Sequence, residues 1–321
     1  DLPGLAVHAA IDGYDYFSAL GWQNAVTESP LRRDHVFHMA SVTKLFVGTS
    51  ILKLKEKGLL ILDEKVTEYL PQFRMADQRY RQITLRHLLT HTSGMPDVKD
   101  YHWESPETDS DALMRYVLSP EVTESQLLWE PGQSRFAYSN MGYEVLGAVI
   151  AAVSGKTFED YVEGNIFIPL RMVDSDLLTF RRNMENVCAP HEKDQDNHFL
   201  VVKCFPYNRS HGPSSTLTST LADMALWAKA VLDKKILRPE TLEEAFTVHA
   251  IVPNNKEGMC ISWFRREQNG HVLYGHEGND DGFRTSFWIC PELKISITVC
   301  VNLSGAPVKR INREIFDIIS P

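Results

Sequence analysis

The spacing of apolar residues changes along the chain, and this change restricts the fold more than any other feature. Residues 4–21 alternate as two short strands that meet at Asp12-Gly13, a dipeptide typical of hairpin turns. An amphipathic helix over residues 308–319 ends the chain. After Gly258 the period of two returns, and strands are predicted over residues 259–264, 271–275, 284–290 and 294–301.

Between these ends the apolar spacing is mostly helical. Helices are predicted over residues 41–57, 85–90, 111–118, 141–153, 158–166 and 221–232. The simplest packing joins the strands from both ends in one antiparallel sheet that is flanked by helices. We therefore predict an α+β fold. Residues 1–60 and 236–321 would form an α/β lobe and residues 61–235 a mainly helical lobe, interleaved as one unit with a ligand site between them.

Charge and hydropathy exclude two classes of protein. The 321 residues carry a net charge of −9 without a long Lys/Arg run, whereas a nucleic-acid or anionic-membrane surface needs a basic patch. The longest uncharged apolar stretch, Val145 to Val153, is far shorter than the roughly 20 residues that cross a bilayer. We therefore expect no nucleic-acid partner and no membrane span, and the oligomeric state stays open.

The cysteines and the first residues bear on where the protein works. The cysteines favour a cytoplasmic protein. Their number is odd, they form no C-x-x-C pair, and we predict that they are buried reduced thiols. They are Cys188, Cys204, Cys260, Cys290 and Cys300. The chain starts without an initiator Met or a signal peptide, so we expect a trimmed or processed start. A secreted or periplasmic protein whose signal peptide has been removed is the alternative.

Several motifs can be set aside as chance matches. His87 and His91 share a helix face as zinc ligands do, yet the Glu of H-E-x-x-H is missing, so structural histidines are expected. The segment from Gly147 to Thr157 departs from a phosphate-binding loop at Ile150, and no G-x-S-x-G occurs. We therefore predict neither a metal nor an organic cofactor.

A nucleophile motif stands at the start of the first long predicted helix. The residues from Ser41 to Lys44 have the form S-x-x-K, and a second match, from Ser50 to Lys53, lies in the middle of the same helix. Free N–H groups and the positive end of the helix dipole would favour a developing oxyanion at Ser41. Ser50 has neither. Ser41 and Lys44 are therefore the candidates, and the plain alternative for Ser41 is an N-cap serine.

Two further motifs support Ser41. Tyr138 and Asn140 form a Tyr-x-Asn motif just before the helix predicted over 141–153. The tripeptide His276-Glu277-Gly278 ends a predicted strand and precedes a turn-like Asn-Asp-Asp-Gly segment. Alone, each motif is unremarkable. Together they supply a nucleophile, an amine base, a phenol that can shuttle a proton and a strand edge with free N–H groups, which are the parts that acyl transfer needs.

With these motifs the sequence resembles the serine β-lactamase and penicillin-binding-protein superfamily, especially its class C β-lactamase-like branch of esterases and peptidases. The likeness covers nearly the whole chain. It is carried by LPGLAV at 2–7, FHMASVTK ending at Lys44, LKEKGLLILDEKVTEYLPQF from Leu54, TLRHLLTHTSGMP ending at Pro96, WEPGQSRFAYSNMGYEVLG ending at Gly147, and GHEG at 275–278. The resemblance implies an α/β lobe and an all-helical lobe with the active site between them.

The resemblance also implies a role for each motif residue. Ser41 would be the nucleophile, and Lys44 would activate it directly or through Tyr138. Tyr138 would take the serine proton, pass it to the leaving group and later activate the deacylating water. Asn140 would hold Lys44 and the substrate by hydrogen bonds. The backbone N–H groups of Ser41 and Asn279 would form the oxyanion hole.

One departure from the family pattern bears on the substrate. Penicillin-recognising enzymes carry Lys-Thr-Gly or a close relative where this chain has His276-Glu277-Gly278, and that lysine helps to hold a substrate carboxylate. His276 and Gly278 would still border the substrate. A neutral His276 beside acidic neighbours offers an anion much less, although Arg284 could compensate. A neutral or cationic substrate is therefore favoured.

The sequence thus predicts a serine hydrolase that acts through an acyl-enzyme on esters or small amides. Its partner is a small-molecule ester, amide or lactam. A β-lactamase or D-amino-acid peptidase is the first alternative, and a non-catalytic scaffold that kept the fold is the second. The complete set of Ser41, Lys44 and Tyr138 disfavours the scaffold, because a scaffold needs none of them.

Overall fold

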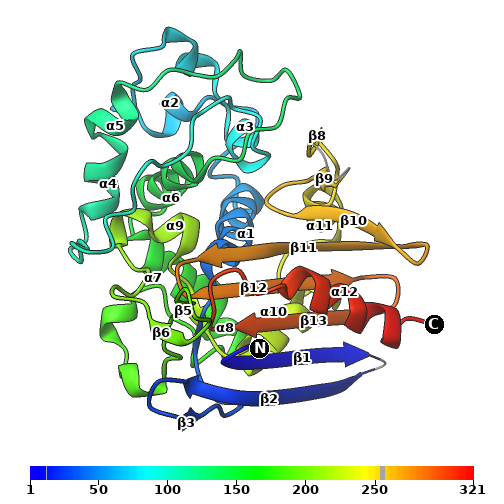
Figure 1. The fold of residues 1–321 in the computed structure, drawn as a ribbon. Coiled ribbons are helices and arrows are strands. Elements are labelled where there is room, and N and C mark those ends of the chain that lie inside the picture. Colours follow the sequence, from blue (N-terminus) through cyan, green and yellow to red (C-terminus); the bar gives the residue numbers. More distant parts are fainter. Residues whose placement is uncertain (12, 254–256) are drawn as a thin grey trace.

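One large antiparallel sheet forms the centre of the fold (Figure 1). The computed structural model describes residues 1–11, 13–253 and 257–321, so Asp12 of the predicted hairpin turn lies outside the described residues. The described strands of the sheet follow the order β3-β2-β1-β13-β12-β11-β10-β9-β8. They are β1 (Gly4–Ile11), β2 (Tyr14–Asn24), β3 (Ser29–Pro30), β8 (Ala250–Ile251), β9 (Gly258–Met259), β10 (Phe264–Gln268), β11 (His271–Asp280), β12 (Phe283–Cys290) and β13 (Ile295–Val301).

Strands from the two ends of the chain meet in this sheet. β1 pairs with β2 on one side and with β13 on the other, where Leu5 lies opposite Val301. β13 is buried along its whole length, and its apolar residues other than Cys300 are β-branched, a type that packs well on a pleated surface. The predicted α+β class is confirmed, because strands from both ends share one helix-flanked antiparallel sheet.

Helices cover both faces of the sheet. α12 (Val308–Ile319) lies over β12 and β13, and its Phe316 packs with the β13 residues that face it. α10 (Leu221–Leu232) contacts β1 and β13 from the opposite face, where Cys300 and Trp227 belong to the larger core. Residues on one strand alternate between the two faces, so a single strand contributes to both cores.

The two longest helices of the middle segment pack against each other. α1 (Thr43–Glu56) and α6 (Asn140–Ser154) are buried over most of their length. The Ser139 hydroxyl caps α6 by accepting a hydrogen bond from the Gly142 N–H, and Gly155 ends the helix in a left-handed conformation. These caps explain why the predicted bounds of α6 match within one residue at each end.

The other described elements are short. The helices are η1 (Ala40–Val42), α2 (Val66–Tyr69), η2 (Gln78–Gln82), α3 (Leu85–Leu89), α4 (Ala112–Val117), α5 (Pro120–Thr123), α7 (Phe158–Val162), the π-helical turn η3 (Glu163–Phe167), α8 (Ile168–Leu170), η4 (Thr179–Arg181), η5 (Met184–Asn186), η6 (Arg209–His211), α9 (Gly212–Ser215) and α11 (Pro239–Ala245). Two small sheets pair β4 (Phe37–His38) with β7 (Thr218–Ser219) and β5 (His191–Lys193) with β6 (Phe199–Val201). The division into lobes at residues 60 and 236 stays a prediction.

Two predicted strands differ in the structure. The strand expected over 259–264 is interrupted: its ends belong to β9 and β10, and residues 260–263 form a turn between them, because Ser262 takes a left-handed backbone (φ 65°) and the Ile261 N–H bonds to the end of α11. β11 does not end near Gly275 but continues to Asp280, because its last residues pair with the start of β12. His276-Glu277-Gly278 therefore lies within a strand.

The cysteines are all unpaired thiols. Cys204 is half-buried and the other four are buried, which agrees with the expectation for all but Cys204. In the described part of the chain, no helix has both the length and the apolar character needed to cross a membrane.

Candidate active site

Ser41 lies in the 3-10 turn η1, directly before α1. Its neighbour Ala40 has φ 48°, a left-handed conformation that costs a non-glycine residue roughly 1–2 kcal/mol. The N-cap of α1 is Val42, and no side chain caps the helix there. Ser41 is therefore not the capping serine that was its alternative interpretation. Its half-buried hydroxyl faces Lys44 instead.

The Lys44 ammonium is enclosed directly behind Ser41. The side chain is fully buried, and Nζ lies 3.0 Å from Ser41 Oγ and donates a 2.7 Å hydrogen bond to the Ser214 carbonyl oxygen. The ring centres of Tyr138 and Tyr143 lie 5.0 and 5.4 Å from Nζ, which is within cation–π range. The spacing of three residues in S-x-x-K places the serine and lysine on the same side of the chain.

Burial changes the acid–base behaviour of Lys44. It lowers the pKa of the ammonium to about 8, and the carboxylates of Glu144, Asp97 and Asp280 act in the opposite direction. At pH 7 about one molecule in ten then carries a neutral amine at this position. Such an amine can accept the proton of a serine hydroxyl.

Tyr138 completes a compact group with Ser41 and Lys44. Its ring stacks on His91, with centroids 4.3 Å apart and planes at 29°. Burial raises the pKa of the Tyr138 phenol well above its usual range, and a hydrogen bond with Ser41 opposes this shift. At neutral pH the phenol therefore keeps its proton, whereas Lys44 is the group whose burial favours the basic form.

The two histidines of the H-x-x-x-H pattern have structural hydrogen bonds. His87 Nδ1 accepts from the Thr84 N–H at the start of α3, and His91 Nδ1 accepts from the Ser139 N–H. Burial lowers the pKa of His91 well below its usual range, so the ring is neutral. The sequence predicted His91 as a structural histidine, but its stacking on Tyr138 was not predicted.

Asn140 is the first residue of α6 and borders the cavity described below. Its backbone N–H donates to Asp97 Oδ1 at 2.7 Å. Within the described part of the structure its buried Oδ1 has no hydrogen-bond partner, and no bond joins it to Lys44, contrary to the expected contact. Lys44 is instead held by Ser41 and Ser214. The Asn140 amide oxygen is thus a buried acceptor without a partner in the described structure.

Gly278 lets β11 approach the turn that carries Ser41. A Cβ atom at this position would collide with the Met39 carbonyl oxygen and with Thr285 Oγ1, and would lie 3.2 Å from the Ala40 Cβ. Thr285 itself donates a 2.9 Å hydrogen bond to the Met39 oxygen. Only glycine therefore fits here, and β11 and η1 lie in direct contact.

His276 lies in β11 with a buried imidazole that faces the cavity. Its Nδ1 donates a 2.7 Å hydrogen bond to the Glu277 carbonyl, since a carbonyl oxygen can only accept. Burial and the nearby Lys44 lower the pKa of His276 to about 3, so Nε2 is a neutral acceptor. The structure thus agrees with the neutral histidine that the sequence predicts at this position.

A cavity of about 610 Å³ joins these residues. Ser41, Tyr138, Asn140, His276 and Asn279 all border it. The charged side chains of its lining are mostly acidic: Asp97, Glu257, Glu277, Asp280, Asp281 and Lys309. Aromatic side chains cover much of the remaining wall: Tyr101, Trp103, Phe136, Phe264 and Trp288.

The charges of the cavity are partly fixed by partners. Lys309 forms a 2.6 Å ion pair with Glu257, and Asp280 Oδ2 lies 2.7 Å from His38 Nε2. Among the described residues Arg284 is not part of the lining, because its guanidinium donates to the carbonyl oxygens of Asp280 and Phe283. The compensating cation considered from the sequence therefore points elsewhere, and the cavity keeps a negative excess.

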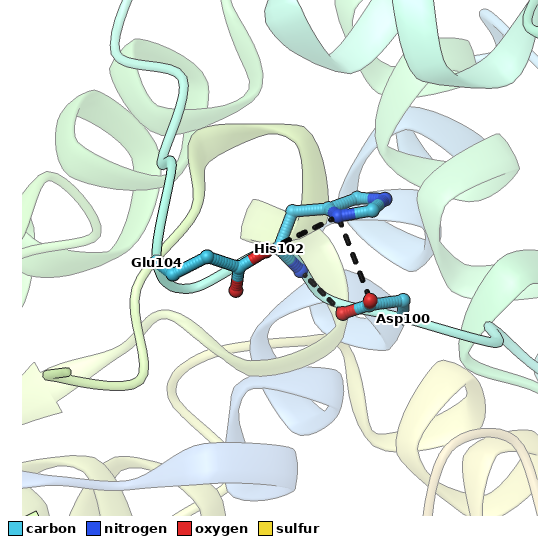
Figure 2. A group of neighbouring side chains, drawn as sticks. All are labelled: Asp100, His102 and Glu104. Carbon is cyan, nitrogen blue, oxygen red and sulfur yellow. Dashed lines mark hydrogen bonds and ion pairs between the residues drawn. The ribbon is translucent and has the colours of Figure 1, made fainter. Parts of the chain in front are cut away.

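Two groups of exposed or half-exposed side chains have ligand types that metals use. Figure 2 shows one of them, in which His102 Nδ1 lies 3.6 Å from Asp100 and 3.7 Å from Glu104. The other comprises Asp194, Asp196 and His198. Neither group borders the Ser41 cavity, and exposed acidic groups of this kind are common on protein surfaces, so we assign no metal site.

The described sheet, its flanking helices and the enclosed Ser–Lys–Tyr group define a β-lactamase/transpeptidase-like fold. A sequence model of the Beta-lactamase family matches residues 1–319, and the chain belongs to this family. The superfamily resemblance seen in the sequence is thus confirmed. Its narrower class C branch stays a prediction.

Known relatives agree with this assignment. Penicillin-binding protein 4* of Bacillus subtilis (strain 168) is 30% identical over 297 residues, which cover 86% of this chain and 63% of the relative. The chain thus spans less than two thirds of that protein. An octameric penicillin-binding protein homologue from Pyrococcus abyssi matches with a TM-score of 0.88 and 26% identity, over 99% of this chain and 73% of the other.

A further solved structure supports the fold alone. The D-amino acid amidase from Ochrobactrum anthropi SV3, in complex with L-phenylalanine amide, matches with a TM-score of 0.84 and 22% identity. The match covers 99% of this chain and 93% of the amidase. The similarity therefore extends over almost the whole length of both proteins.

Proposed function

We propose that this protein is a serine hydrolase that forms an acyl-enzyme at Ser41. One observation carries the proposal: the fully buried Lys44 Nζ lies 3.0 Å from Ser41 Oγ. A lysine enclosed in this way contributes little to stability as a charged group, because burial of the ammonium is costly. As a neutral amine beside a hydroxyl, it is a base for nucleophilic catalysis.

The first chemical step transfers the serine proton to Lys44. The neutral amine takes the Ser41 hydroxyl proton while Oγ bonds to the substrate carbonyl carbon, and the carbonyl oxygen becomes an oxyanion. Ser41 and Asn279 N–H groups would stabilise that oxyanion; removal of one such donor costs about 10²–10³ in rate. Tyr138, kept neutral by burial, then donates its proton to the departing alcohol or amine and regains one from Lys44.

The second step reverses these transfers with water. The Tyr138–Lys44 pair accepts a proton from water, hydroxide adds to the acyl carbon, and Ser41 Oγ leaves with a returned proton. The Asn140 side chain, which borders the cavity, would hold the substrate by a hydrogen bond during both steps. This assignment moves the principal base from Tyr138 to Lys44, compared with the route through Tyr138 that the sequence also allowed.

The cavity charge supports a neutral or cationic substrate. Its described acidic side chains outnumber its single lysine, and that lysine is paired with Glu257. The imidazole of His276 is neutral and presents an acceptor nitrogen, so it cannot hold a carboxylate. We therefore propose small amides or esters that carry a free amino group, a class that includes D-amino acid amides such as those that the amidase neighbour's name implies.

A chromogenic substrate panel tests this ranking. It contains short-chain aryl esters, D-amino acid anilides with a free ammonium group, their N-succinyl derivatives and a chromogenic cephalosporin. We expect the ammonium-bearing anilides to exceed the anionic succinyl derivatives by about tenfold or more in kcat/KM, since a like-charge contact costs several kcal/mol and about 1.4 kcal/mol already corresponds to tenfold. Turnover of the cephalosporin far above that of the aryl esters would contradict the ranking.

The penicillin-recognising alternative has its own support in the 30% identity to penicillin-binding protein 4*. It predicts a stable adduct of labelled penicillin on the Ser41 peptide, detectable by mass spectrometry. The scaffold alternative predicts that a fluorophosphonate probe leaves Ser41 unlabelled in the folded protein. Both measurements can be made on the same sample.

The pH dependence of acylation follows from Lys44. Because the free amine is the reactive form, kcat/KM should rise about tenfold per pH unit below the pKa of about 8 and level off above it. The rate measured for a neutral aryl ester between pH 5.5 and 9.5 checks this, with buffer ions varied as a control. If kcat/KM instead rises with a midpoint below about pH 5, the base is a carboxylate.

A further inference from the structure

A second buried pair of titratable side chains lies behind Lys44, outside the cavity lining. Glu144 belongs to α6 and is fully buried, and its Oε1 lies 3.3 Å from His211 Nδ1. His211 ends η6 and is also buried. The rings of Tyr101 and Tyr116 contact the imidazole edge-on, with centroids 4.9 and 4.5 Å away. Neither member of the pair touches the cavity, so neither contacts a substrate there.

The pair is connected to Lys44 by the short helix that follows it. Ser214, in α9, donates its hydroxyl to the His211 carbonyl oxygen at 3.2 Å. The Ser214 carbonyl oxygen in turn accepts the 2.7 Å hydrogen bond from Lys44 Nζ. α6 and α9 pack against each other and against α1, so the three helices hold the pair and the lysine in one buried unit.

We propose that Glu144 and His211 are positioning residues for Lys44: the pair fixes the α9 turn so that the Ser214 carbonyl faces the ammonium, and it places a carboxylate behind the lysine. This inference rests on the proposed function of Ser41 and Lys44. It adds a requirement that the S-x-x-K and Tyr-x-Asn motifs do not contain.

The electrostatics give the pair a definite effect. Of the carboxylates near Lys44, Glu144 opposes the lowering of the lysine pKa most strongly. Burial raises the pKa of Glu144 itself, and the hydrogen bond to His211 opposes that rise and so favours the charged carboxylate. Other ionisable groups also face Lys44 and stay unchanged in a Glu144 variant: Asp97, Asp280, His91, His276, Tyr138 and Tyr143.

The direction of the effect follows. Glu144→Gln removes the negative charge and keeps the side-chain shape, so the ammonium of Lys44 loses stabilisation and gives up its proton at lower pH. The midpoint of the rise in acylation rate with pH, the acidic limb of the profile, should therefore shift by about one unit toward lower pH. A merely structural contact would change stability or the plateau rate without moving this limb.

A matched control exists in the same region. Glu159 of α7 is also buried, and its Oε1 lies 2.9 Å from Nε of Arg209, which belongs to the same η6 turn as His211. Glu159 is not among the groups that act on the pKa of Lys44. Glu159→Gln therefore breaks a comparable buried pair, and we expect it to leave the acidic limb where it is in the wild type.

The experiment measures the second-order rate of fluorophosphonate labelling of Ser41 between pH 5 and 10, by intact-mass spectrometry, in the wild type, Glu144→Gln and Glu159→Gln. Glu144→Met, an uncharged side chain of similar volume, repeats the test if the amide variant does not fold. A thermal melt accompanies each variant. We expect the acidic limb to shift only in the two Glu144 variants.

The outcomes separate this inference from the proposed function. If a folded Glu144→Gln or Glu144→Met protein shows its rise in labelling rate at the same pH as the wild type, the inference is overturned. Failure of both variants to fold would also overturn it, because the pair would then be structural. An equal shift in Glu159→Gln would also count against it. If instead the wild type is never labelled at Ser41, the proposed function itself is wrong.

Discussion

Replacing Ser41 with alanine should lower turnover by about 10⁴-fold or more and leave the melting temperature within about 2 °C of the wild type. The hydroxyl is the proposed nucleophile, so its removal ends acyl-enzyme formation. Its loss costs little stability because Ser41 does not cap α1, and its hydroxyl contacts only groups of the site in the described structure. Steady-state hydrolysis of an aryl ester and a thermal melt measure the two effects.

The same helix provides the control for this variant. Ser50 has the second S-x-x-K match, yet its buried hydroxyl donates to the Phe46 carbonyl oxygen within α1. Ser50→Ala should therefore retain nearly full turnover. Equal loss of activity in both variants would mean that alanine disturbs α1 as a whole, and unfolding of Ser41→Ala alone would make Ser41 structural.

Gly278→Ala should reduce kcat/KM by about 10²-fold, the size of effect that follows from displacing a reacting group by about 1 Å. The new methyl group would collide with a backbone oxygen of Met39, which cannot rotate away, so β11 and η1 must separate. That movement carries Ser41 and Asn279 apart. Rates for a neutral ester report the loss, and unchanged secondary structure by circular dichroism excludes global unfolding.

A glycine far from the site serves as the comparison. A Cβ at Gly164, in the π-helical turn, meets no described atom within 4 Å other than those of its chain neighbours and its own helix backbone. Gly164→Ala should therefore keep the wild-type rate. If Gly278→Ala also keeps it, the close approach of β11 to η1 has no role in positioning the nucleophile.

The motifs of the sequence point to side chains that the structure places together, whereas the backbone group that holds Lys44 was not predicted. S-x-x-K and Tyr-x-Asn select Ser41, Lys44 and Tyr138 because both motifs are defined by side chains with the proposed chemistry. The partner that holds Lys44 is the carbonyl oxygen of Ser214, and every residue type has a carbonyl. Its helix, α9, is too short to show a period of its own.

Strand ends were predicted less well than helix ends, for a physical reason. Ser139 and Gly155 mark the ends of α6 by capping chemistry that the residue types reveal. The end of β11 depends instead on partners elsewhere in the chain: Asn279 and Asp280 have turn-like side chains, yet the backbone pairing with β12 keeps them extended. Such pairing has no local sequence signal.

The pairing of β1 with β13 also has a consequence during protein synthesis. β1 leaves the ribosome long before its neighbour β13 has been made, because Leu5 lies opposite Val301. At about 5–20 residues per second the hairpin of β1 and β2 waits for tens of seconds with one edge unpaired. The central part of the sheet therefore forms only after β13 has been synthesised, and in that interval the open edge needs protection from aggregation, by chaperones or by charged neighbours.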